Sequence, residues 1–175
     1  LATAAPAATL SGLVKGGGAP IADSSVTLWS AGTDQPTRLA EARSGADGRF
    51  SITVPAAVAA DVSYYLVARG GQPTSNAARG NNDHIALLTV LGSTIPRTVT
   101  INEMTTVASV WTHNQFIMGT AIKGQPLQLR IAAGNVPSFV DLQTGGLGAT
   151  IQDPLNGGQT PTLANFSTLA DALAG

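Results

Sequence analysis

Alternating apolar and polar residues over the first hundred positions predict short β-strands joined by turns. The clearest example is the segment in which Phe50, Ile52 and Val54 share one face and polar residues occupy the other. The dipeptide Asp47-Gly48 just before it predicts a tight hairpin turn. The segments with strand character are 9–15, 25–29, 38–43, 49–54, 63–69, 85–91 and 97–102.

After residue 102 the spacing of apolar residues changes to three and four, which is typical of an amphipathic helix. Val107, Val110 and Trp111 form such a stripe within 103–117, and we expect them to be the buried face of a helix. Asn102 is expected to cap this helix, because its side-chain oxygen can accept a hydrogen bond from a free amide of the first turn.

Two further helices are predicted nearer the C-terminus. One covers 125–133, with Pro126 in its first turn and Gly134-Asn135 as its stop signal. The other covers 162–174. Its apolar face consists of Leu163, Phe166, Leu169, Ala170 and Leu173.

Together these elements predict a mainly β fold, namely a seven-stranded antiparallel sandwich followed by a smaller, helical and loop-rich C-terminal part. The expected division is an N-terminal tail at 1–8, the sandwich at 9–102 and the helical part at 103–175. The helical part is short and rich in glycine, so we expect it to pack on the sandwich and not to fold independently.

The composition excludes several classes of function. Charged residues make up only 11% of the chain, against about 25% in ordinary soluble domains. Nine basic and ten acidic residues give a formal net charge of −1, which is not the electrostatic footprint of a protein that binds nucleic acid or an anionic membrane. There is no cysteine, so disulfides and thiolate chemistry are excluded. No segment approaches the roughly 20 apolar residues needed to span a membrane.

The scarcity of charge also bears on association. The surface has to be covered mainly by Thr, Ser, Asn, Gln, Gly and Ala, and weak charge repulsion lets identical molecules approach one another. This pattern favours a secreted or cell-surface protein whose partners are copies of itself. The alternative is a monomer from an alanine-rich proteome of low charge.

The N-terminal segment is small, apolar and uncharged. Such a segment can lie along a sheet edge of a neighbouring subunit as an added strand, although Pro6 limits its pairing. Head-to-tail contacts of this kind produce fibres when the rotation between subunits does not close. The alternative is a frayed terminus. The residues of this candidate inter-subunit tail are Leu1, Ala2, Thr3, Ala4, Ala5, Pro6, Ala7, Ala8 and Thr9.

A polar loop contains the only candidate metal ligands. Asn81, Asn82 and Asp83 offer side-chain oxygens, but calcium requires six to eight oxygens and usually several carboxylates. A calcium site would therefore need help from Glu103 or Asp61. An ordinary Asx-rich loop is the simpler interpretation. No other cofactor is expected.

Nothing in the sequence indicates an enzyme. No serine has Gly-x-Ser-x-Gly context, no acid is spaced to orient His113, and we expect His113 to lie on the solvent side of its helix. The aromatic residues Trp29, Trp111, Tyr64 and Tyr65 can either form a sugar-stacking platform or belong to the core. Because aromatics are only 5% of the chain, the core is the favoured interpretation.

Four segments, at 10–14, 18–28, 46–52 and 65–71, carry a series of motifs. A strand is followed by a Gly-x-Pro-Ile turn and a second strand, then by an Asp-Gly-x-Phe strand, and the last segment ends in Gly-Gly. Over about 9–102 the chain therefore resembles the prealbumin-like, carboxypeptidase-regulatory-like modules of secreted proteins. The resemblance implies an Ig-like sandwich that serves as a scaffold or a binding appendage, and it does not specify a function.

The same resemblance suggests one covalent feature. Related surface modules form Lys–Asn isopeptide cross-links beside a buried carboxylate. Here Lys15 lies on the first strand and Asn102 on the last, with Glu41 or Glu103 as the candidate carboxylate. The alternative is an exposed strand end, since glycines follow Lys15 directly.

The second part, at 100–108 and 168–174, is similar to a segment found in large uncharacterised secreted bacterial proteins. We therefore expect a bacterial protein, extracellular or on the cell surface, with a non-catalytic structural role as a self-associating subunit, for example of a filament. The alternative is a binding or adhesion module of a larger secreted protein, recognising a glycan or another protein.

Overall fold

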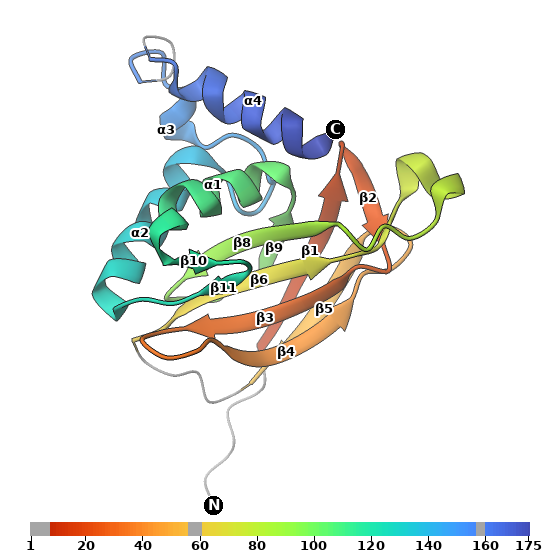
Figure 1. The fold of residues 1–175 in the computed structure, drawn as a ribbon, viewed down its shortest axis with the longest axis horizontal. Helices are drawn as coiled ribbons and strands as arrows, with labels where there is room; N and C mark the ends of the chain where they lie inside the picture. The colour runs from red at the N-terminus through yellow and green to blue at the C-terminus, as the bar shows by residue number, and fades with distance from the viewer. Residues whose placement is uncertain (1–7, 56–60, 157–159) are drawn as a thin grey trace, which may run out of the picture.

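Figure 1 shows the computed structural model of the protein, which describes residues 8–55, 61–156 and 160–175. Two β-sheets pack face to face, and a group of helices covers the outer side of one of them. The mainly β class expected from the sequence is confirmed.

The first sheet is built around β1 (Ala8–Gly16). This strand pairs antiparallel with β5 on one side and parallel with β9 on the other. Its last residues pair with β2, which in turn pairs with β7. The other strands of this sheet are β5 (Arg49–Val54), β2 (Ala19–Ala22), β7 (Gln72–Pro73) and β9 (Thr98–Ile101).

The second sheet is antiparallel throughout, and β4 and β8 form its two edges. In spatial order its strands are β4 (Thr37–Arg43), β3 (Ser25–Ala31), β6 (Ser63–Arg69) and β8 (Ala86–Gly92).

The inward side chains of both sheets form one hydrophobic core, as the alternating pattern predicts. Phe50 is 4% exposed and lies across β1 at Gly12. A Cβ at Gly12 would come within 2.4 Å of the Phe50 ring and 2.7 Å of the Val99 carbonyl oxygen, so only glycine permits this approach.

Some details of the sandwich differ from the expectation. The described residues form nine strands in the two sheets, because β2 and β7 are too short to show an alternating pattern. β9 pairs in parallel with β1, since the chain crosses between the sheets after β8. The turn at Asp47-Gly48 does form, and Arg49 N donates to Asp47 Oδ1 at 3.1 Å. It is not a hairpin turn, because it joins β4 of one sheet to β5 of the other.

The helices pack on the outward side chains of β6 and β8 and form a second hydrophobic core with them. No helix in the described part is both long and apolar enough to cross a membrane. The elements of this part are α1 (Glu103–His113), α2 (Pro126–Phe139), α3 (Ala149–Gln152), α4 (Thr162–Ala174), the short helix η2 (Asn114–Phe116), and the strands β10 (Ile117–Met118) and β11 (Ala121–Ile122).

The expected end of the second helix is wrong, whereas the expected bounds of the last helix are confirmed. α2 continues past Gly134 and through Pro137 to Phe139. The additional turn places Val136, which is 1% exposed, in the second core, and this burial outweighs the low helix propensity of glycine.

The buried face of α1 is not the one that the apolar spacing predicts. Val110 and Trp111 are 43% and 39% exposed. The buried side is instead small and polar, and it includes Thr106, Ser109 and His113. The predicted cap is confirmed, because the Asn102 side chain accepts from the amide of the third residue of the helix at 2.9 Å.

This polar side of α1 covers the outer edge of β8. Thr106 Oγ1 accepts from Leu88 N at 3.0 Å, and Ser109 Oγ accepts from Val90 N at 2.9 Å. Each hydroxyl also donates to the carbonyl four residues earlier in the chain, at 2.7 Å. The helix therefore supplies the hydrogen bonds that a further strand would otherwise supply, and the edge is closed.

Replacing Thr106 by Val should lower the free energy of unfolding by about 1–3 kcal/mol, because the buried Leu88 N–H loses its acceptor. Thr168→Val is the matched control. The Thr168 hydroxyl also donates to the carbonyl four residues earlier but accepts nothing from a strand, so we expect a change within about 0.5 kcal/mol. Urea denaturation measures both variants, and equal effects would show that the closed edge contributes no stability.

Candidate binding cleft

A cleft of about 770 Å³ opens where the β1–β2 turn, the loop after β7 and the end of α4 meet, at the end of the sandwich that carries the C-terminus. Its floor is apolar and includes Ile21, Ile85 and Leu87, and its rim is polar. A concave apolar floor with a few polar groups around it is the usual form of a binding site.

One wall of the cleft is the turn between β1 and β2. Gly17 and Gly18 both have positive φ, 57° and 79°, which is the geometry of a two-residue type I′ hairpin. Gly17 N donates to Glu103 Oε1 at 2.6 Å. This bond ties the turn to the first residue of α1, where a negative charge also suits the helix dipole.

A second part of the lining comes from the loop that follows β7, which contains η1 (Thr74–Arg79). Gly71 N donates to Asn81 Oδ1 at 2.8 Å, and His84 N donates to Asn82 Oδ1 at 3.1 Å. The Asn81 amide group in turn donates to Asp83 Oδ1. The asparagines thus hold the shape of the loop.

These bonds bear on the calcium alternative. The two amide oxygens at Asn81 and Asn82 already accept backbone hydrogen bonds. Glu103 lines the same cleft as Asp83, but one of its oxygens is bonded to the β1–β2 turn. Within the described ranges, no group of three His, Cys, Asp or Glu residues is placed to hold a metal ion. The hydrogen bonds that Asn81 and Asn82 accept are those of an Asx-rich loop.

Several rim side chains have unused hydrogen-bonding groups. Among the described residues, no hydrogen bond or ion pair engages the side chains of Ser75, Asn76, Arg79 or His84. They present donors and acceptors to whatever enters the cleft. Sequence reasoning did not identify this site, because its lining comes from segments between Gly16 and Gly175 that only the fold brings together.

Lys15 and Asn102, the residues of the candidate isopeptide bond, directly follow Val14 and Ile101, which pair with each other in the neighbouring strands β1 and β9, but the Asn102 side chain has other partners. Asn102 Nδ2 donates to the Gly145 carbonyl at 2.9 Å, while its oxygen caps α1. Lys15 lies in β1 opposite Pro20. Both the nitrogen and the oxygen of the Asn102 side-chain amide are therefore already hydrogen-bonded.

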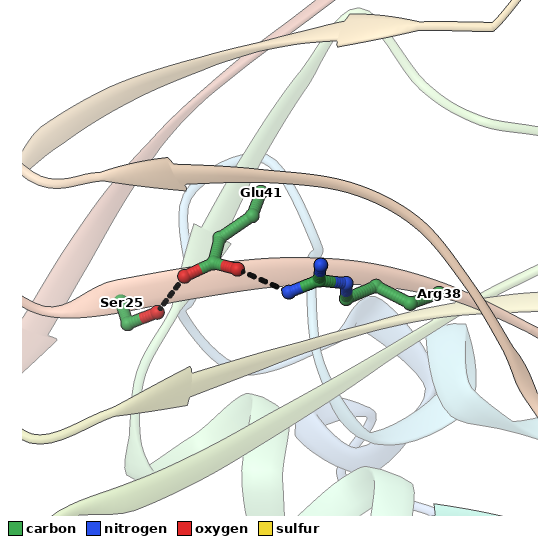
Figure 2. A network of polar contacts seen from close by, with 3 residues as sticks. All are labelled: Ser25, Arg38 and Glu41. Carbon is green, nitrogen blue, oxygen red and sulfur yellow. Dashed lines mark hydrogen bonds and ion pairs between the residues drawn. The ribbon is translucent and has the colours of Figure 1, made fainter.

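Glu41 lies elsewhere, on the edge strand β4. Figure 2 shows its two oxygens accepting from Ser25 Oγ and from Arg38 Nη1, both at 2.7 Å. The Arg38 and Glu41 side chains are 61% and 41% exposed. Glu41 is thus an exposed, ion-paired carboxylate and not the buried, neutral one that the cross-link requires.

The four aromatic residues considered for a sugar platform do not form one surface. Tyr64 and Tyr65 are adjacent in β6, so their side chains enter opposite cores. Trp29 stacks on Tyr65 with ring centroids 6.3 Å apart, and Trp111 packs on Phe139 at 5.7 Å. These rings mainly serve packing.

The tail is only partly described. Ala8 and Thr9 belong to β1, where on one side they pair with Val54 and Thr53 in β5 of the same chain. Residues Leu1 to Ala7 lie outside the described residues.

The expected solvent position of His113 is wrong, because this last residue of α1 has a fully buried side chain. Its Nδ1 lies 2.8 Å from Thr112 Oγ1, and its ring meets Phe116 edge to face. Burial lowers the pKa of His113 below its usual 6.5, against smaller opposing effects of the Ser109 and Leu129 backbone.

This burial predicts a pH-dependent stability. Below about pH 6.5 the unfolded chain takes up a proton at His113 that the folded protein resists, so the free energy of unfolding should fall as the pH falls and should be unaffected above about pH 7.5. His113→Gln should flatten this dependence in urea denaturation measured from pH 5 to 8. An unchanged pH dependence in that variant would assign the effect to other groups.

Comparisons with known proteins do not assign this chain to a family. No family model matches the chain, and no curated protein matches it either. The resemblance of 9–102 to prealbumin-like modules therefore rests on the motifs alone.

Proposed function

We propose that this protein is a non-catalytic structural subunit that associates with copies of itself outside the cell, with a bacterial surface filament as its extended form. The observation that carries the proposal is the concentration of exposed apolar side chains on the helical part. In the described residues, the large apolar side chains that are 39–80% exposed all follow residue 103: Val110, Trp111, Met118, Leu127, Ile131, Leu155, Leu169 and Leu173.

Two of the helices present these side chains as short stripes. Leu127 and Ile131 are 57% and 60% exposed and lie one turn apart on α2. Leu169 and Leu173 are 50% and 47% exposed and lie one turn apart on α4. Residues four apart lie side by side on a helix, so each pair offers a continuous apolar surface to a neighbour.

Little electrostatic repulsion opposes this association. The net charge is −1, and the described α-helices carry only three Asp, Glu, Lys or Arg residues, namely Glu103, Arg130 and Asp171. Two copies can therefore bring their helical surfaces together without burying many charges.

The sandwich fits this role as a scaffold. We propose that it is of the carboxypeptidase-regulatory-like, prealbumin-like type found in secreted proteins. The two-sheet arrangement and the turn at Asp47-Gly48 support this proposal, and such modules commonly carry structure instead of catalysis.

Purified protein should form larger species as its concentration rises, and moderate salt should not dissolve them, because apolar contacts drive the association. The double variant Leu127→Ser, Ile131→Ser should weaken association by about tenfold or more, since each buried aliphatic side chain contributes about 1.5–3 kcal/mol. Gln128→Ser on the same helix is the matched control and should behave as wild type. Sedimentation velocity measures all three proteins, and monomers alone at every concentration would overturn the proposal.

The cleft favours a second candidate, a binding or adhesion module for a glycan or a protein. Its unengaged rim groups, such as Asn76 and Arg79, are of the kind that recognise hydroxyl and peptide groups. A protein that stays monomeric and is retained on a glycan or protein array would support this candidate over self-association.

A further inference from the structure

We propose that the cleft is the receptor for residues 1–7 of a second copy of this chain, so that copies join end to end. This inference rests on the proposed self-association and adds a second contact to that of the helical surfaces, between the cleft and this segment.

The two partners of this contact lie at opposite ends of one strand. Residues 1–7 precede Ala8, where β1 begins, and Gly16 and Gly17 line the cleft where β1 ends. Repeated from copy to copy, a contact between two different surfaces of the same subunit builds an open chain of subunits when the rotation between copies does not close.

Residues 1–7 cannot fill the cleft of their own chain in this way. Seven residues reach at most about 25 Å when fully extended. The eight residue steps from Ala8 to Gly16 span about 27 Å, and the segment would have to turn back along β1. Over residues 11–13 both sides of β1 are already paired, with β5 and with β9. The occupant therefore has to come from another copy.

The chemistry of the cleft suits an extended, uncharged peptide. The segment Leu1 to Ala7 has no charged side chain, so burying its side chains costs no charge desolvation. The floor at Ile21, Ile85 and Leu87 can take its small apolar side chains.

The rim and one wall suit the peptide backbone. An extended chain needs partners for its N–H and C=O groups, and the unengaged side chains of Ser75, Asn76 and Arg79 can provide them. Where β1 ends, Gly16 and Gly17 also line the cleft, and they have no side chains that would keep a second backbone away.

The absence of cysteine from the chain makes a direct cross-linking test possible. Ala4→Cys places a thiol in the segment, and Asn76→Cys places one on the rim of the cleft. The two variants are mixed at a concentration at which wild type associates, and are then oxidised. We expect a disulfide-linked mixed dimer of these two variants. Thr168→Cys replaces Asn76→Cys in the control mixture, because Thr168 is exposed on α4 and lies outside the cleft. The yield of mixed dimer should be several times higher with Asn76→Cys than with Thr168→Cys. Equal yields with the two partner variants would overturn the inference.

A second variant tests the cleft without a cross-link. Ala86 is exposed, lies at the start of β8 and lines the cleft, so Ala86→Trp fills the space without disturbing the core. It should reduce end-to-end growth at least as strongly as deletion of residues 1–7. Ser51→Trp, at an exposed strand position away from the cleft, should not.

The two proposals fail differently. If wild type remains monomeric, the proposed function is wrong. If wild type associates but neither Ala86→Trp nor the deletion changes growth, self-association stands and the cleft is not its receptor.

Discussion

The structure depends on the closure of the β8 edge by hydroxyl groups of α1. Thr106 and Ser109 accept hydrogen bonds from the backbone N–H groups that a neighbouring strand would otherwise take, so the helical part is held to the sandwich by directed bonds as well as by apolar packing. α1 starts directly after β9, and its position also brings Glu103 to the β1–β2 turn. The cleft is therefore a consequence of the same closure.

Closing β8 also decides which surfaces remain for other molecules. The opposite edge of that sheet, β4, carries charged side chains, including the ion-paired Arg38 and Glu41, which discourage pairing with a further strand. The exposed apolar side chains lie instead on the helical part. The proposed association between copies would therefore use the helices and the cleft and not the charged sheet edge.

Much of the fold could be predicted from local patterns, and much of the site could not. The bounds of β5, β6 and α4 follow from alternation, turn residues and helical spacing. The orientation of α1 did not follow, because the need of β8 for hydrogen-bond partners is a tertiary effect that outweighs the apolar stripe at Val110 and Trp111. His113 was misplaced for the same reason. Only the Asn-rich loop of the cleft carried a sequence signal, and that signal indicated turns.

The central claim is that this chain acts by presenting one end of the sandwich to the other end of an identical neighbour. High-resolution electron microscopy of the concentrated protein tests it most directly. The account predicts linear assemblies in which extended density from residues 1–7 of one copy fills the cleft between Gly17 and Asn76 of the next. Assemblies whose clefts face solvent, or fields of single particles alone, would contradict it.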